Sequence, residues 1–146
     1  MTQIQSAQVI AGHLLQETGI ALMDRDCDAF MRHIAFPHTI ETFQGEQRIE
    51  TEGHFRAVFQ SFRDHLCKIG VTDAVRRVIE ASFKTDTRIE STHEVRLLNG
   101  DVLVQTPYVA YSVILWDGKE GRWKIASSIY AITDAPELNA ALVTVA

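Results

Sequence analysis

The sequence is poor in cysteine and has neither a long apolar run nor an export signal. Its two cysteines, Cys27 and Cys67, allow at most one disulfide and lie outside any CxxC motif, which argues against a disulfide-rich secreted domain. No apolar stretch approaches the ~20 residues of a membrane-spanning helix. Residues Met1–Gln5 lack a basic region and an apolar core, so we expect no signal peptide, reduced thiols and a cytoplasmic location.

Positive charge is scarce as well. The chain carries 14 Lys and Arg residues against 19 Asp and Glu residues, a formal net charge of -5. Its densest basic spot, Arg76-Arg77, is flanked by Asp73 and Glu80. Nucleic acids and anionic membranes bind to basic patches that neutralise phosphates. We therefore expect no nucleic acid and no membrane as a partner.

The motifs of the common catalytic centres are absent too. There is no GxGxxG, Walker, HExxH or GxSxG pattern, so nothing indicates nucleotide, zinc or serine-hydrolase chemistry. His54 and His65 lie on one expected helix, but their separation of about 16 Å along the axis is too large for a shared metal ion. We expect neither a cofactor nor a metal.

The sequence does contain the patterning of one ordinary globular domain over residues 1–146. Apolar residues recur at steps of three and four in three segments, which is typical of amphipathic helices. Asp26 and Thr51 are expected N-caps, Pro37 is expected to end the second helix, and Gly70 the third. These helices are expected over Ile4–Leu22, Cys27–Ala35 and Phe55–Ile69.

Strand patterns surround and follow the third helix. After Gly70 the hydrophobic period changes to two, and Asn99-Gly100 and Asp117-Gly118 are hairpin signals. The order, helices first and a meander of strands after them, predicts an α+β fold with a curved antiparallel sheet packed on N-terminal helices. The expected strands, and a tail helix after them, are His38–Phe43, Gln47–Glu50, Val75–Lys84, Arg88–Leu97, Val102–Trp116, Trp123–Ile132 and Pro136–Leu142.

The last two strands are apolar on both faces. The first two strands of the meander instead carry Arg, Glu, Lys and Thr on the outer face, which places Arg76 outside. Pro107 cannot donate a ladder hydrogen bond and predicts a bulge in the third strand. Helices cover only the inner face, so the outer apolar patch must be covered either by a second copy of the chain or by the tail helix. We expect a homodimer. This patch consists of Val109, Tyr111, Val113 and Tyr130.

Two histidines are candidate acids or bases. His93 lies on the inner face of its strand between Ser91 and Val95, where it acts either as a pocket acid or base or as an ordinary core histidine. His38 shares a strand face with Thr42, whereas Glu41 would face inward only if the register slipped by one residue. His38 and His93 are therefore the candidate catalytic residues.

Other side chains are expected to line the same pocket. Tyr108, Ser112 and Ser127 share the inner face of the last two strands, where each can donate a hydrogen bond to a ligand oxygen or to a neighbouring residue. Phe59 and Phe62, on the third helix, are expected to form an apolar wall.

The order of elements resembles the cone-shaped, cystatin-like fold of nuclear transport factor 2, and in particular its SnoaL-like and ketosteroid-isomerase-like members. The resemblance covers residues from about 5 to 133. It implies a deep pocket between the sheet and the helices, and dimerisation through the outer face of the sheet. Its markers are Leu22-Met23-Asp24-Arg25-Asp26-Cys27-Asp28-Ala29-Phe30, Thr39-Ile40-Glu41, Gly45 and Gly121-Arg122-Trp123-Lys124-Ile125.

The isomerase pattern itself is not preserved. By the resemblance, the general-base aspartate falls at Thr42, the oxyanion-hole tyrosine at Thr18, and the oxyanion-hole aspartic acid near Ser112. A hydroxyl cannot replace the base, although these three residues keep hydrogen-bonding capacity in the pocket. Dehydratases of this fold pair a pocket histidine with a tyrosine, which the two histidines and Tyr108 match in residue type.

Three functions remain open at this stage. The first is a SnoaL-like protein that binds a small organic molecule in a mainly apolar pocket. The second is a lyase or isomerase, of dehydratase, cyclase or ketosteroid-isomerase type, that acts on a hydroxylated or carbonyl-bearing ring compound. The third is a structural small subunit that pairs with a larger enzyme.

Overall fold

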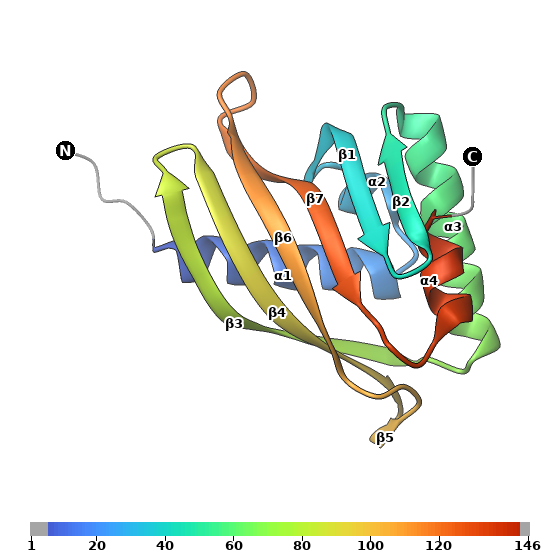
Figure 1. Cartoon of the computed structure of the whole chain (residues 1–146). Coiled ribbons are helices and arrows are strands. Elements are labelled where there is room, and N and C mark those ends of the chain that lie inside the picture. Colours follow the sequence, from blue (N-terminus) through green and yellow to red (C-terminus); the bar gives the residue numbers. More distant parts are fainter. Residues whose placement is uncertain (1–5, 144–146) are drawn as a thin grey trace.

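The computed structural model describes residues 6–143 and places the helices on one face of a single curved sheet (Figure 1). The expected helical residue Ile4 lies outside the described residues. Helix α1 crosses behind β3, β4 and β6, whereas α3 and α4 stand beside β1 and β2. The elements are α1 Ala7–Met23, α2 Cys27–Met31, β1 Ile34–Thr42, β2 Gly45–Ile49, α3 Glu52–Lys68, β3 Asp73–Thr85, β4 Arg88–Asn99, β5 Val102–Leu103, β6 Tyr108–Asp117, β7 Arg122–Ala131 and α4 Pro136–Val143.

The sheet is mixed rather than purely antiparallel. Its order is β2-β1-β7-β6-β4-β3, with the two-residue β5 paired to β4. Every pair is antiparallel except β1 and β7, which run parallel, with Thr39 opposite Ser127. The expectation of an antiparallel sheet is wrong at this one junction. The reason is that α3 and the whole meander separate the two strands in the chain, so no hairpin constrains their direction.

The helix ends follow the expected chemistry except at Pro37. The Oδ1 of Asp26 accepts a hydrogen bond from the N–H of Ala29 at 3.0 Å, and the Oγ1 of Thr51 accepts one from the N–H of His54 at 3.1 Å, so both predicted N-caps are confirmed. Helix α2, however, ends at Met31, and Pro37 lies exposed inside β1, where the register against β7 shifts. A proline is tolerated there because an irregular position needs no ladder donor.

Gly70 terminates α3 in a conformation that other residues rarely adopt. Its φ is +81°, and a Cβ at this position would lie 3.2 Å from Nδ2 of Asn99. We expect Gly70→Ala to lower the free energy of unfolding by about 1–2 kcal/mol, measured by urea denaturation. The control is Gly53→Ala in the first turn of α3, where no atom lies within 4 Å and a gain of roughly 0.5 kcal/mol is expected. Equal effects of the two substitutions would contradict this account.

A bulge in β3 reverses the expected orientation of Arg76. The pairing runs from Val78 opposite His93 directly to Glu80 opposite Thr92, so Ile79 is an extra residue in β3. Before the bulge, Arg76 and Val78 face the helices and Ile79 faces outward with 49% of its surface exposed. The prediction that Arg76 lies on the outer face is therefore wrong, because the extra residue shifts the alternation by one position.

A second bulge, in β7, has the same effect on Ser127 and Tyr130. Val113 pairs with Ser127 and Ile114 with Ile125, so Ala126 is the extra residue. Beyond Ala126 the inner face carries Ser128 and Tyr130, and the outer face carries Ser127. The expected inward orientation of Ser127 and outward orientation of Tyr130 are both wrong for this reason.

The outer face of the sheet retains part of the expected apolar patch. Val109, Tyr111 and Val113 face outward, and Ile129 takes the place expected for Tyr130. Tyr111 and Ile129 are 45% and 42% exposed. The tail helix α4 does not cover them, because it packs against α3, β1 and β2 on the inner side. The homodimer through this face stays a prediction.

The long apolar segment Val102–Trp116 is two strands rather than one. Leu98 and Asn99 pair with β5, and the chain then leaves the sheet before β6 begins at Tyr108. Pro107 thus marks an interruption instead of the bulge that the sequence predicts, because it immediately precedes the first ladder position of β6.

Candidate functional site

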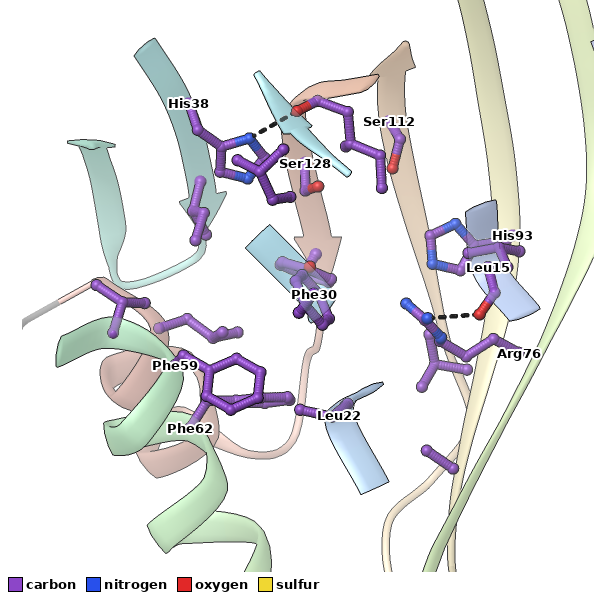
Figure 2. A pocket seen from close by; sticks show the side chains of 18 of the residues that line it. Leu15, Leu22, Phe30, His38, Phe59, Phe62, Arg76, His93, Ser112 and Ser128 are labelled. Carbon is purple, nitrogen blue, oxygen red and sulfur yellow. Dashed lines mark hydrogen bonds between the residues drawn. The ribbon is translucent and has the colours of Figure 1, made fainter. Parts of the chain in front are cut away.

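A cavity of about 80 Å³ lies between the inner face of the sheet and the helices (Figure 2). Side chains from α1, α2, α3, α4 and five strands contribute to its wall. Most are apolar, and the polar ones gather on the sheet. The lining residues are Leu15, Leu22, Phe30, Ile34, His38, Ile40, Phe55, Val58, Phe59, Phe62, Ala74, Arg76, His93, Val95, Leu97, Tyr108, Ser112, Ile125, Ser128, Tyr130 and Leu142.

The helical wall of the cavity is aromatic. On α3, Phe55, Phe59 and Phe62 recur at steps of three and four and face the sheet, and Phe30 joins them from α2. The ring centroids of Phe30 lie 5.7 Å from Phe55 and 5.5 Å from Phe59, in tilted and edge-to-face arrangements that aromatic pairs favour. This wall is suited to an aromatic or aliphatic group.

His38 is fixed at one end of the cavity in a single tautomer. Its Nδ1 lies 3.1 Å from the carbonyl oxygen of Ile125, and because a carbonyl only accepts, Nδ1 carries the proton. Burial lowers the pKa of His38 to about 4, against the opposing effect of the backbone carbonyls at Ile125 and Ala126. The ring is therefore neutral at pH 7, with the lone pair on Nε2. Figure 2 shows Ser128 of β7 next to it and Ser112 farther along the same wall, on β6.

Arg76 lies on the opposite side of the same cavity. Its Nη2 donates to the carbonyl oxygen of Leu15 at 2.8 Å and to the Oγ1 of Thr18, both on α1. Thr18 in turn donates to the carbonyl oxygen of Leu14 at 2.7 Å. Burial lowers the pKa of Arg76, which nevertheless remains charged at neutral pH. The Nε atom of Arg76 is buried and has no hydrogen-bond partner among the described residues.

His93 neighbours Arg76 on the same wall. The strand pairing places Val95 opposite Arg76 and His93 opposite Val78, so the two polar side chains project from adjacent strands (Figure 2). Burial and then the charge of Arg76 lower the pKa of His93 to about 3, which makes it neutral at pH 7. Within the part of the chain that the structure describes, Nε2 of His93 is buried without a partner.

Two tyrosines complete the polar wall. Tyr108 and Tyr130 lie on β6 and β7, with ring centroids 6.4 Å apart in an edge-to-face arrangement. Burial raises the pKa of Tyr108 well above its usual value, so this phenol stays protonated and can donate a hydrogen bond.

The structure brings most of the predicted site residues together. The cavity is lined by both candidate catalytic histidines and by Phe59, Phe62, Tyr108 and Ser112. Thr18 lies behind Arg76 and is fully buried. Thr42 and Ser127 do not line the cavity: Thr42 accepts a hydrogen bond from the N–H of Gln44 at 3.1 Å in the β1–β2 turn, and Ser127 faces outward.

Sequence reasoning missed three polar residues of the wall. Arg76, Tyr130 and Ser128 line the cavity, but the alternation read from the sequence places them on the other face. The signal that could have found them is the position of the two bulges, and neither bulge residue, Ile79 or Ala126, is a glycine or proline that would have marked it.

The cavity has donors and one cation but no acid. Among the described residues, none that lines it is an Asp or Glu. The same part of the chain holds no group of three or more His, Cys, Asp or Glu side chains arranged for a metal ion. The arrangement can hold an apolar group and donate hydrogen bonds to one polar end. It offers no carboxylate as general base for proton abstraction.

Solved structures share this architecture. A protein of unknown function with a cystatin-like fold from Nostoc punctiforme has a TM-score of 0.67 at 10% identity, over 87% of this chain and 91% of its own. A nuclear transport factor 2-like protein of unknown function from Shewanella oneidensis has a TM-score of 0.66 at 11% identity, over 84% and 97%. A ketosteroid isomerase-like protein from Erwinia carotovora atroseptica has a TM-score of 0.63 at 11% identity, over 88% and 97%.

These similarities define the fold. The chain has the α+β fold of nuclear transport factor 2-like and cystatin-like proteins, as the order of elements predicts. No protein-family model and no curated protein matches the sequence. At this level of identity, the shared fold does not imply a shared activity.

Within residues 6–143, no helix combines the length and apolar character needed to cross a bilayer.

Proposed function

We propose that this protein binds a small, largely apolar organic molecule in the cavity between sheet and helices. The observation that carries the proposal is the wall itself, in which a phenylalanine cluster faces polar side chains that include His93, whose buried Nε2 has no partner within residues 6–143. Buried polar atoms are normally hydrogen-bonded, so unpartnered atoms beside an empty space indicate a group that the protein does not itself supply.

The size of the cavity limits the ligand. About 80 Å³ is smaller than the ~150 Å³ of an apolar protein cavity known to hold benzene. A one-ring compound therefore needs a modest shift of the surrounding side chains, and a steroid-sized compound needs a large one. We infer that one-ring compounds are the appropriate class.

The second candidate function is a lyase or isomerase. It is supported by His38, whose Nδ1–H is held by the carbonyl oxygen of Ile125 so that Nε2 is available as a base. Its pKa of about 4 makes it a weak base at pH 7, and no lining carboxylate among the described residues replaces it. Ligand binding without catalysis is therefore the better supported proposal. Nothing specific in the cavity favours a structural small subunit.

The test uses a neutral one-ring compound and a variant that fills the cavity. Benzyl alcohol is expected to bind with a dissociation constant on the order of 0.1–1 mM and to raise the melting temperature by about 3–10 °C at 10 mM. Ser112→Leu adds apolar volume to the wall and is expected to abolish this shift and the accompanying changes in the amide NMR spectrum.

The matched control is Val113→Leu, at the next position of β6, which faces outward. It is expected to bind benzyl alcohol like the parent chain, and both variants should show cooperative unfolding. Absence of binding to the parent by benzyl alcohol and a wider panel of one-ring compounds would overturn the proposal. Unchanged binding in Ser112→Leu would show that the ligand lies elsewhere.

A further inference from the structure

We propose that the cavity selects a small aromatic monocarboxylate, whose carboxylate is held by the guanidinium of Arg76 while its ring packs on the phenylalanines of α2 and α3. This inference rests on the proposed function, because it names the ligand class for the same cavity. It concerns the charge of the ligand, which the binding of a neutral ring compound does not address.

The first argument is the unused donor capacity of Arg76. A guanidinium has five N–H donors, and both bonds to α1 leave from Nη2, which has two of them. Nε lies on the α1 side of the group, 3.8 Å from a Cβ built at Gly19. Because the guanidinium is planar, Nη1 and its two N–H groups lie on the other edge, toward the cavity that Arg76 lines. The two hydrogen bonds to α1 thus fix the position of the guanidinium and leave other N–H groups available for an anion.

The second argument is the missing counter-ion. Arg76 forms no ion pair within 4.0 Å with any carboxylate of the described residues, whereas the adjacent Arg77, on the outer face, lies 3.9 Å from Glu94. An uncompensated charge on a cavity wall is unfavourable, and an anionic ligand removes that cost. The arrangement is typical of a site that a ligand neutralises.

The third argument is His93, which provides a second donor at the same place. Its ring is neutral at neutral pH, and its Nε2 lacks a partner within the described part of the chain. When Nε2 carries the proton, one carboxylate oxygen can accept from Nε2 while the other accepts from Arg76. Figure 2 shows His93 beside the guanidinium and Phe59 and Phe62 across the cavity, which matches a molecule with one anionic end and one aromatic end.

The charge count specifies a monoanion. Arg76 is the one lining residue among those described that is cationic at neutral pH, since both lining histidines are neutral. A dianion such as a phosphate monoester would leave a net negative charge in the cavity, which is costly to bury. A carboxylate is fully neutralised by one guanidinium.

The alternative reading is that Arg76 only joins β3 to α1. In that case its substitution destabilises the fold but does not change which ligands bind. A comparison of two nearly isosteric ligands separates the readings, because benzoate and benzamide differ in charge but hardly in shape.

The experiment titrates benzoate, benzamide and phenyl phosphate into the parent chain, Arg76→Met and Arg77→Met, with dissociation constants from amide NMR shifts at constant ionic strength. The parent is expected to bind benzoate at least tenfold more tightly than benzamide or phenyl phosphate. Arg76→Met should weaken benzoate binding at least tenfold and change benzamide binding less than twofold. Arg77→Met, the outward-facing neighbour, should bind all three ligands like the parent.

Three results would overturn the proposal. Equal or tighter binding of benzamide to the parent contradicts an anion site, and benzoate binding that survives Arg76→Met contradicts the role of Arg76. Binding of none of the ring compounds overturns the proposed function as well, which distinguishes the two failures. The comparison of benzoate with benzamide uses only the parent chain, so it tests the anion site even if Arg76→Met does not fold. Arg76→Gln is a second substitution at the same position.

Discussion

Acidification from pH 7.5 to pH 4 is expected to lower the free energy of unfolding by about 4–6 kcal/mol, because two buried histidines resist protonation in the folded state. The pKa of His38 is lowered to about 4 and that of His93 to about 3, mainly by burial. In the unfolded chain both have a pKa of about 6.5. Between these values the unfolded state binds more protons, so stability falls as the pH falls. The measurement is urea denaturation at a series of pH values.

The surroundings of each ring set this direction. His93 faces the cation Arg76, which opposes a second positive charge. At His38, burial against groups such as the ring of Phe55 outweighs the backbone carbonyls of Ile125 and Ala126, which favour the protonated form. The pKa values of His33 and His65 are also lowered by partial burial and add to the effect. The carboxyl groups with lowered pKa, such as Asp117, lose their contribution only below about pH 4.

Substitution of the two histidines tests the assignment. The double variant His38→Gln, His93→Gln is expected to lose much less stability between pH 7.5 and pH 5 than the parent, whatever its stability at pH 7.5. His13→Gln, at an exposed position of α1, is the matched control and should follow the parent profile. A double variant as acid-sensitive as the parent would assign the effect to other groups.

Phe55→Ala is expected to cost about 3–5 kcal/mol of unfolding free energy, the second large effect in this molecule. Phe55 is 4% exposed, and its ring lies within 6.4 Å, centroid to centroid, of the rings of Phe30, Phe36, His38 and Phe59. Removal of the ring leaves a void at the junction of α2, α3 and β1 that adjoins the cavity. The lost free energy of unfolding has two parts: the hydrophobic stabilisation from burying the ring, and the packing contacts that the ring makes. It is measured as a shift in the urea midpoint.

The control for this prediction is Phe43→Ala. Phe43 follows β1 in the turn to β2 and is 65% exposed, so its removal is expected to change stability by less than about 0.5 kcal/mol. Similar costs for the two substitutions would mean that Phe55 is not part of a close-packed cluster.

The sequence predicts the site best where strands are regular. In β4 the alternation of Ser91, His93 and Val95 runs without interruption against β6, and His93 lies on the cavity wall as expected. Helix α3 presents Phe59 and Phe62 to the cavity for the same reason, since steps of three and four define one helix face. In a regular helix or strand, the orientation of one side chain therefore predicts the orientation of all the others.

The sequence fails where one extra residue reverses that information. Ile79 in β3 and Ala126 in β7 are bulge residues that look like ordinary strand positions, and each moves a polar residue, Arg76 or Ser128, to the inner face. A bulge is defined by the pairing of a strand with its neighbour, and the hydrophobic pattern of a single segment carries no information about that pairing. The parallel pairing of β1 with β7 is missed for a similar reason, because it depends on segments that are far apart in the chain.

The parallel pairing of β1 with β7 also affects the order in which parts of the sheet can form while the chain is being synthesised. The hydrogen bond between His38 and the carbonyl oxygen of Ile125 joins residues 87 positions apart. A chain leaving the ribosome can therefore pair β1 with β2 early, but the other edge of β1 stays without its partner strand until β7 has emerged. Contacts of such high sequence separation slow folding and expose nascent chains to aggregation. The wall that carries His38 is thus among the last parts of the molecule to form.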